Sequence, residues 1–166
     1  MNVLLVLGHP RTESFCGALA QAYRDGALEA GADVRKLALA DLEFDPDVHT
    51  ECPSEQELEA DLLEARRGIE WADHLVFVYP NWWGTMPALL KGFFDRLFTP
   101  GFAFEHYEDG AGAGKRELLS EKTAELIVTM TGSIPTARHP SNRLICPTAF
   151  AINVSAGAEN ARGTCD

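Results

Sequence analysis

The sequence has few cysteines, and none of them lie close together. The four cysteines, Cys16, Cys52, Cys146 and Cys165, are scattered, and no C-x-x-C pair occurs among them. Disulfide frameworks and zinc sites need cysteines at set spacings, so we expect neither, and we predict no metal site. Isolated thiols of this kind are typical of the reducing cytoplasm, which is the predicted location.

Positive charge and long apolar runs are also scarce. The chain has 14 lysines and arginines against 25 aspartates and glutamates, which gives a net charge of −11. This balance disfavours binding to nucleic acid or to anionic membranes. No run reaches the length of a membrane span, so membrane insertion is not expected, and the apolar start 1–7 lacks the basic residues of a signal peptide. The 166 residues predict one domain with its own core.

Short apolar runs alternate with segments of helical periodicity, which predicts an α/β fold. Strands are expected at residues 3–7, 33–39, 74–79, 123–130 and 149–155. The continuous apolar character of the first run suits a central parallel strand that is covered on both faces. We therefore predict a doubly wound parallel sheet with the strand order 2-1-3-4-5 and an atypical or incomplete C-terminal part.

Local signals indicate where the helices begin and end. Ser14 is a good N-cap for the first helix, and Gly31 is a plausible stop. The capping-box signature at 54–57 predicts the start of a second helix. Pro87 suits the first position of a third helix. The glycine-rich segment 110–114 is expected to be a flexible tip and lacks the features of a phosphate loop.

The loop Gly8–Ser14 joins the first strand to the first helix. Free backbone N–H groups and the positive end of the helix dipole favour a phosphate at such a position. The loop adds four side chains that can donate hydrogen bonds to phosphate oxygens: His9, Arg11, Thr12 and Ser14. Any one of them could simply cap the helix or be solvated, but the cluster predicts a phosphate site. The usual dinucleotide fingerprint, G-x-G-x-x-G, is absent.

Two adjacent tryptophans, Trp82 and Trp83, follow the third strand. Large flat rings gain nothing from facing water, so they either cap the core or form a wall for a planar ligand. In the predicted sheet this loop lies beside the first loop and beside the small polar residues 129–132. A phosphate anchor, a flat wall and polar groups at its edge together predict a flavin site.

Four stretches carry a family resemblance: Gly8–Phe15, Trp71–Trp83, Met86–Arg96 and Gly101–Phe104. They resemble the flavodoxin-like NAD(P)H:quinone reductases, the group of DT-diaphorase and its bacterial relatives. The resemblance covers roughly residues 1–131 of a single flavodoxin-like domain, 1–166, and leaves a divergent tail at 132–166.

This resemblance implies a bound flavin, FMN or FAD, and a homodimer with its sites at the subunit interface. It also implies two-electron hydride transfer from NAD(P)H to a quinone through flavin N5 by a ping-pong route, which requires no acid or base side chain. Phe102 and Phe104 would point toward the second subunit's site, although ordinary packing explains them equally well. With Arg11 from the loop analysis, the implied flavin contacts are His9, Thr12, Ser14, Phe15, Cys16, Pro80, Asn81, Trp82, Trp83, Gly84, Thr129, Met130, Thr131 and Gly132.

After Gly132 the sequence departs from the family pattern. Three prolines, at 135, 140 and 147, argue against a long fourth helix. No tyrosine follows Tyr107, so the family's tyrosine near the ring has no counterpart, and His139 is the single candidate for a catalytic side chain. We expect this tail to be the least well-packed part of the molecule.

The sequence leaves alternatives to a reductase open. The protein could be a regulatory flavoprotein subunit of a potassium-efflux-type transporter, since some members of the family have that role. It could instead be a one-electron carrier like flavodoxin, or a flavin-binding protein that its divergent tail has inactivated.

Overall fold

A computed structural model describes residues 1–109, 112–130 and 150–154. Its main sheet has five strands in the order β2-β1-β3-β6-β7, and a separate two-stranded hairpin pairs β4 with β5. The strands are β1 (Asn2–Leu7), β2 (Asp33–Ala38), β3 (His74–Pro80), β4 (Phe104–Asp109), β5 (Gly112–Glu117), β6 (Thr123–Thr129) and β7 (Phe150–Val154). The helices are α1 (Phe15–Glu29), α2 (Ala60–Trp71) and α3 (Ala88–Leu97), with two short 3₁₀ turns, η1 (Leu39–Asp41) and η2 (Pro53–Glu55).

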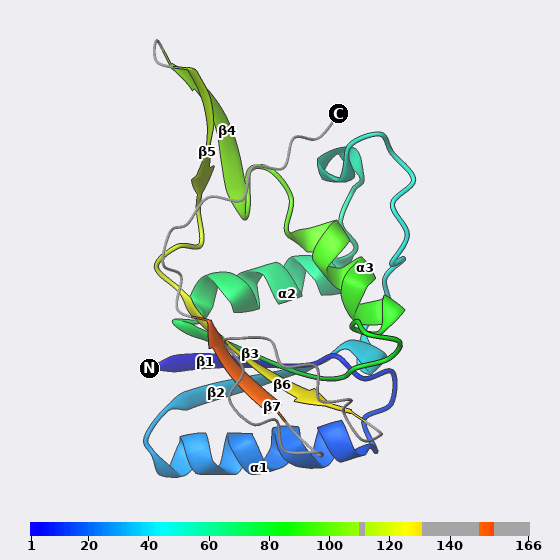
Figure 1. Cartoon of the computed structure of the whole chain (residues 1–166), viewed down its shortest axis with the longest axis vertical. Coiled ribbons are helices and arrows are strands. Elements are labelled where there is room, and N and C mark those ends of the chain that lie inside the picture. The colour runs from blue at the N-terminus through cyan, green and yellow to red at the C-terminus, as the bar shows by residue number, and fades with distance from the viewer. Residues whose placement is uncertain (110–111, 131–149, 155–166) are drawn as a thin grey trace, which may run out of the picture.

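The sheet separates two layers of helices (Figure 1). Helix α1 covers one face, and α2 and α3 cover the other. Alternate residues of β1 supply the two cores: Leu4 and Val6 pack on the α2 side, while Val3, Leu5 and Leu7 pack on the α1 side. This explains why the first strand reads as a continuous apolar run, as a central strand buried on both faces should.

The strand order and the flavodoxin-like fold agree with the prediction, but the last strand runs the other way. Strands β1, β2, β3 and β6 are parallel, whereas β7 is antiparallel to β6, with Ala124 opposite Val154 and Val128 opposite Phe150. The expected parallel pairing is therefore wrong for β7, which lies in the part of the chain that the sequence predicts to be atypical. An alternating apolar segment specifies which faces are buried, but it does not encode the direction of the strand.

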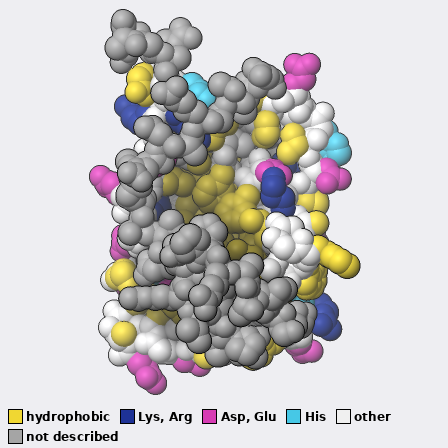
Figure 2. All heavy atoms as spheres, in the orientation of Figure 1, with side chains coloured by type: hydrophobic (Ala, Val, Ile, Leu, Met, Phe, Trp, Pro, Cys, Tyr) yellow, Lys and Arg dark blue, Asp and Glu magenta, His cyan; other side chains and the backbone are white. Residues whose placement is uncertain are grey.

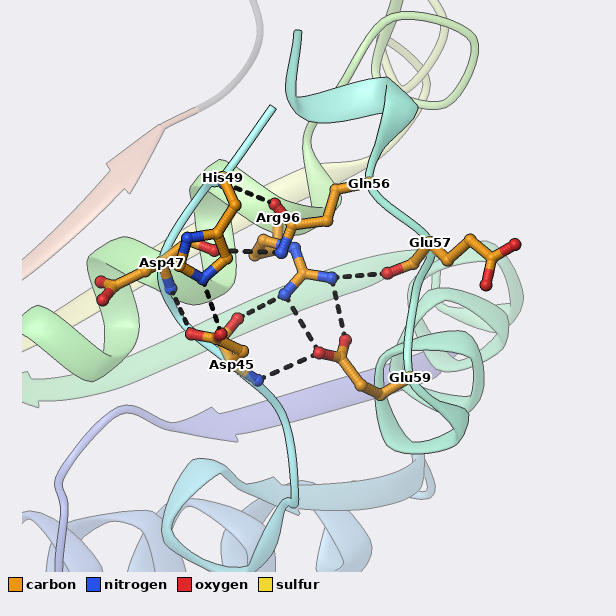
Figure 3. A network of polar contacts seen from close by, with 7 residues as sticks. All are labelled: Asp45, Asp47, His49, Gln56, Glu57, Glu59 and Arg96. Atoms are coloured by element: carbon orange, nitrogen blue, oxygen red, sulfur yellow. Dashed lines mark hydrogen bonds and ion pairs between the residues drawn. The ribbon is translucent and has the colours of Figure 1, made fainter. Parts of the chain in front are cut away.

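The predicted capping box at 54–57 does not start a helix. Residues Pro53–Glu55 form η2, and α2 begins at Ala60 with Glu59 in the N-cap position. Gln56 and Glu57 of this segment make hydrogen bonds to residues outside it (Figure 3). Buried Arg96 of α3 donates to the carbonyl oxygen of Glu57 over 2.7 Å and to both carboxylate oxygens of Glu59 over 3.1 and 3.0 Å.

Arg96 also fastens the preceding excursion to α3. Its guanidinium donates to the carbonyl oxygen of Asp45. The Gln56 side chain spans the same excursion, because it accepts the N–H of His49 and donates to the carbonyl oxygen of Asp47. The residues that read as a local helix start are therefore used for long-range contacts, which a local signature cannot anticipate.

Smaller differences concern two boundaries. Pro87 is the N-cap of α3 rather than its first helical residue. Gly112 and Gly114 belong to β5, so the predicted flexible tip reduces to residues 110–111, which lie outside the described part of the chain. The packing prediction for the tail also concerns residues outside the described part, apart from the strand β7 itself.

Candidate functional site

Three loops begin side by side at the carboxyl edge of the sheet. The N–H of Gly8 donates to the carbonyl oxygen of Val78 over 2.8 Å, and the N–H of Asn81 donates to that of Thr129 over 2.7 Å. These bonds extend the pairing of β1 with β3 and of β3 with β6 beyond the strands. The loops that follow β1, β3 and β6 therefore meet where open α/β sheets bind their ligands.

The first loop folds tightly onto the start of α1. Ser14 is the N-cap, and its Oγ accepts the N–H of Gly17 over 3.1 Å. A Cβ atom on Gly17 would lie 2.0 Å from the carbonyl oxygen of Thr12, so only glycine permits this approach. Because the cap uses Ser14 as an acceptor, its hydroxyl hydrogen remains to donate to a ligand.

His9 is held by the backbone of the same loop. Its side chain is buried, and its Nδ1 lies 2.9 Å from both the carbonyl oxygen and the amide nitrogen of Arg11. Nδ1 is thus engaged in either tautomer, and Nε2 is the ring nitrogen left for a ligand. When Nδ1 accepts the Arg11 N–H, Nε2 carries the proton and acts as a donor.

The surroundings of His9 favour the neutral imidazole. Burial lowers the pKa of His9; the backbone hydrogen bond with Arg11 works against this lowering, and the nearby Arg11 guanidinium adds to it. A neutral imidazole with its proton on Nε2 can donate to a phosphate oxygen without a large cost of desolvating a charge.

The remaining residues of the first loop divide by exposure. Arg11 is exposed and Thr12 is half-buried. Phe15, the first residue of α1, leaves 58% of its surface exposed, whereas Cys16 next to it is buried. Burial raises the pKa of the Cys16 thiol, partly opposed by its hydrogen bond with Thr129, so the thiol stays protonated.

The tryptophan loop is a tight turn. The N–H of Trp82 donates to the carbonyl oxygen of Thr85 over 2.8 Å, and Thr85 returns a bond of 3.2 Å. Between them Trp83 has φ 55° and Gly84 has φ 85°. Two positive φ values in succession are typical of a type I′ turn, and they are unfavourable for a bulky residue such as Trp83.

The turn points both indole rings away from the core. Trp83 is fully exposed, and Trp82 is 45% exposed. The Trp82 ring meets His9 edge to face, with 5.5 Å between the ring centroids and 72° between the planes. The alternative in which one or both rings cap the core does not hold for Trp83 and holds at most in part for Trp82, and the loop after β1 and the tryptophan loop are in direct contact.

Asn81 carries a buried acceptor that has no partner. Its Oδ1 is enclosed and makes no hydrogen bond to any residue that the structure describes. Leaving such a group unpaired costs about 1–3 kcal/mol, so in a native protein it usually has a reason. Asn81 lies between the buried Pro80 and the exposed Trp82, at the point where the loops meet.

The loop after β6 is described only at its start. Thr129 and Met130 are half-buried, and Thr129 contacts both neighbouring loops. The predicted contacts of Thr131 and Gly132, and the candidate His139, lie outside the described residues.

Phe102 and Phe104 have different surroundings. Phe102 is buried in the core on the α2 side, near Phe98 and beneath the Arg66 guanidinium, whose Cζ lies 4.5 Å from the ring centroid. This is ordinary packing within the chain. Phe104 is half-buried at the base of β4, where Lys115 Nζ lies 3.8 Å from its ring centroid.

Sequence reasoning missed two connections. One is the Arg96 network, and the other is the contact between Cys16 Sγ and Thr129 Oγ1, which joins residues 113 positions apart over 3.2 Å. No local spacing signals either contact. The strand order 2-1-3-4 predicts that the start of α1 lies near the end of β6. It does not predict which side chains of the two segments make contact.

Hydrophobic side chains gather in the middle of the face that Figure 2 shows, on the α2 side of the sheet. Strand β6 has a neighbour on each side, yet Val128 is its only buried residue. Half-buried apolar residues on this side include Phe94, Phe98, Leu119 and Leu126. The sheet is therefore less well covered around β6 than around β1.

A cleft of about 520 Å³ lies away from the three loops, along the second half of α1. It is lined mostly by small apolar side chains, and its Tyr23 hydroxyl is already donated to Glu125. Among the residues that the structure describes, no group of three or more histidines, cysteines or acids could hold a metal ion. Within the same residues, no helix is long and apolar enough to span a membrane.

Comparisons with known proteins give relatives named as dihydronicotinamide dehydrogenases and quinone oxidoreductases. The chain is 33% identical over 155 residues to the ribosyldihydronicotinamide dehydrogenase-like protein traD of Penicillium crustosum, covering 80% of this chain and 58% of that protein. It is 31% identical over 145 residues to the mouse ribosyldihydronicotinamide dehydrogenase [quinone], covering 74% and 63%. The chain thus spans about 60% of the length of these relatives.

A solved structure gives the same indication. The NAD(P)H:quinone oxidoreductase of Methanothermobacter marburgensis is 34% identical and superposes with a TM-score of 0.56, over 62% of this chain and 55% of that one. The family model described as a flavodoxin-like fold matches residues 1–150. The resemblance read from the four sequence stretches is confirmed, and the chain belongs to this flavodoxin-like family, together with the quinone reductases.

Proposed function

We propose that the protein is a flavin-dependent NAD(P)H:quinone oxidoreductase. The observation that carries this proposal is the set of unused polar groups where the three loops meet. Among the residues that the structure describes, the Ser14 hydroxyl hydrogen and His9 Nε2 are left for a ligand, and Asn81 Oδ1 has no donor; Nε2 donates in the tautomer whose Nδ1 accepts the Arg11 N–H. Donors at one end and an acceptor at the other match a ligand with a phosphate and an N–H edge.

The residues present fit a flavin. Ser14, His9 and the start of α1 would hold the phosphate, because the helix dipole and two neutral donors all favour an anion there. Asn81 would accept a hydrogen bond from the ring edge. Trp82 and Trp83 would provide the flat apolar wall. A phosphate held at this position suits FMN, and it suits FAD equally well because FAD contains the FMN unit.

A bound flavin supplies the redox chemistry, accepting hydride from NAD(P)H and passing two electrons to a quinone. The protein's own residues bind and orient the reactants. The tight turn Trp82–Thr85 would hold the indole rings beside the flavin ring. The exposed side chains of Trp83 and Phe15 leave apolar surface on which a flat electron acceptor could lie. None of the described side chains needs to transfer a proton. The names of the relatives support an oxidoreductase over a transporter subunit.

We further propose that the protein acts as a cytoplasmic homodimer. The hairpin β4–β5 projects from the body of the molecule (Figure 1), and each of its strands pairs only with the other in the described chain. An isolated two-stranded hairpin is marginally stable in water, so a second subunit that covers it would stabilise it.

The first test is a visible absorption spectrum of the protein purified without added cofactor. A flavin band that NADPH bleaches without oxygen, and that a quinone restores, is the expected result. A flavin band that NAD(P)H does not bleach would argue for a binding role without reductase activity. A colourless protein that also takes up neither FMN nor FAD would contradict the proposal.

A further inference from the structure

Thr129, the last residue of β6, is bonded to the first turn of α1 and to the start of the tryptophan loop. Its Oγ1 lies 3.2 Å from Sγ of Cys16, and its carbonyl oxygen accepts the N–H of Asn81 over 2.7 Å. Cys16 is in the first turn of α1, two residues after the Ser14 cap. Asn81 opens the loop of the two tryptophans. One residue thus joins the phosphate side of the site to the ring side.

The contact between Cys16 and Thr129 is part-buried, with the thiol as its enclosed side. Cys16 is 2% exposed, so water has little access to replace a lost partner. A protonated thiol is a weak donor and acceptor, and either Sγ or Oγ1 can supply the hydrogen. The carbonyl bond to Asn81 belongs to the backbone and does not depend on either side chain. Removing the thiol or the hydroxyl would therefore loosen α1 from β6 while the ring side stays in place.

We propose that Cys16 and Thr129 are a pair of positioning residues that set the distance between the phosphate half and the ring half of the cofactor site. This inference rests on the proposed function. In FMN the phosphate and the ring are joined covalently. Contacts with the two ends therefore strengthen FMN binding together only when the two halves of the site are held at the matching separation. The side-chain pair acts on the phosphate half, through the first turn of α1 and its Ser14 cap, while the backbone bond between Thr129 and Asn81 fixes the ring half.

Two ligands separate this role from a general loss of folding. FMN uses both halves of the site, whereas riboflavin lacks the phosphate and uses the ring half alone. Cys16→Ala and Thr129→Val should each weaken FMN binding about tenfold, because a buried hydrogen bond is lost. Riboflavin binding should stay within about twofold of the wild type, since the ring half is unchanged. Fluorescence titration of the apoprotein measures both affinities.

Conservative and double variants test the pairing itself. Cys16→Ser and Thr129→Ser retain a hydroxyl, so they should restore most of the FMN affinity. The double variant Cys16→Ala with Thr129→Val should lose no more affinity than either single variant, because both remove the same contact. Cys52→Ala, at the chain's other described cysteine, is the matched control and should bind FMN like the wild type.

The possible results are distinguishable. Parallel losses for FMN and riboflavin, or FMN affinities unchanged in Cys16→Ala and Thr129→Val, would overturn the positioning role while the proposed function stands. A wild-type protein that binds neither FMN nor riboflavin would remove the proposed function and the positioning role together.

Discussion

At the scale of single residues, Trp83 combines strain with full exposure. Its φ of 55° lies in the left-handed region, which a bulky side chain occupies at a cost of about 1 kcal/mol. It recovers none of this by burial, since the ring is fully exposed. Strain that the fold does not need often marks a functional position. The arrangement is consistent with a ring kept free for a ligand.

Substituting this residue should separate stability from binding. Trp83→Asn creates Asn-Gly, the preferred pair for a type I′ turn, and should raise the free energy of unfolding by about 1 kcal/mol. The same variant should weaken flavin binding because it removes part of the wall. Urea denaturation of the apoprotein and flavin titration measure the two effects. A variant that is more stable and binds flavin normally would mean that the ring is not part of the site.

The pair of rings can be tested together. Trp82→Ala with Trp83→Ala should weaken flavin binding far more than Arg67→Ala does. Arg67 is a suitable control because it lies on the surface of α2 and its exposed side chain pairs with Glu64. Flavin titration measures both variants, and equal effects would show that the loop has only a structural role.

His9 should give a pH dependence to stability. Its pKa in the folded protein is lowered below the ordinary 6.5, so the unfolded chain binds a proton more readily than the folded one. The contribution of the neutral imidazole is therefore complete above the unfolded pKa and is lost as the pH falls through it toward the folded pKa.

Comparing urea denaturation of the wild type and His9→Asn at about pH 7.5 and about pH 5 isolates this contribution, because the other groups titrate alike in both proteins. The variant keeps a polar group that can accept the Arg11 N–H. It should lose less stability on acidification than the wild type. Equal losses in the two proteins would contradict the assignment.

At the scale of elements, Arg96 determines where α2 begins. Its guanidinium is fully buried and joins α3 to Glu59, to Glu57 and to the carbonyl oxygen of Asp45. Burial by itself would raise the pKa of Glu59, but hydrogen bonds from Arg96 and from the backbone of Asp45 bring it below its ordinary value. The stabilisation by ionised Glu59 is therefore present above its unfolded pKa and is lost as the pH falls.

Removing Arg96 should destabilise the protein strongly. Arg96→Met leaves a carboxylate and two carbonyl groups without their donor, and the expected loss is about 3–5 kcal/mol in the free energy of unfolding. Lys91→Ala on the exposed side of the same helix removes only the pair with Asp95 and should cost less than about 1 kcal/mol. Chemical denaturation compares the two variants. Similar losses would show that the network contributes little.

At the scale of the whole molecule, the projecting hairpin is the feature on which the proposed dimer rests. Tyr107 of β4 lies flat over Gly114 of β5, where a Cβ atom would meet its ring at 2.5 Å. Despite this contact, 48% of the Tyr107 surface is exposed. An exposed aromatic residue on a projecting hairpin is typical of a surface that binds another subunit.

Sedimentation velocity should find a dimer for the wild type and a shift toward monomer for Tyr107→Asp. Leu28→Asp is the matched control, because Leu28 is 43% exposed on α1, far from the hairpin in the fold. The control should remain dimeric. A wild type that stays monomeric at high concentration, or two variants that dissociate alike, would contradict a dimer built on the hairpin.

The sequence by itself determined the class of fold and the edge at which the site lies. Apolar periodicity predicts the elements, and the rules for parallel sheets predict their order, so the meeting of the Gly8, Asn81 and Thr129 loops follows without coordinates. The four family stretches narrowed the expected chemistry further. These inferences succeed because they depend on local pattern and on topology, which the chain encodes directly.

Only the tertiary structure decided the contacts between distant segments. The antiparallel direction of β7, the start of α2 at Ala60 and the bond between Cys16 and Thr129 all depend on partners far away in the sequence. The same holds for Oδ1 of Asn81, which has no donor among the described residues, because that depends on how distant segments pack around it. Long-range packing overrides local preference wherever a buried group such as Arg96 must be satisfied.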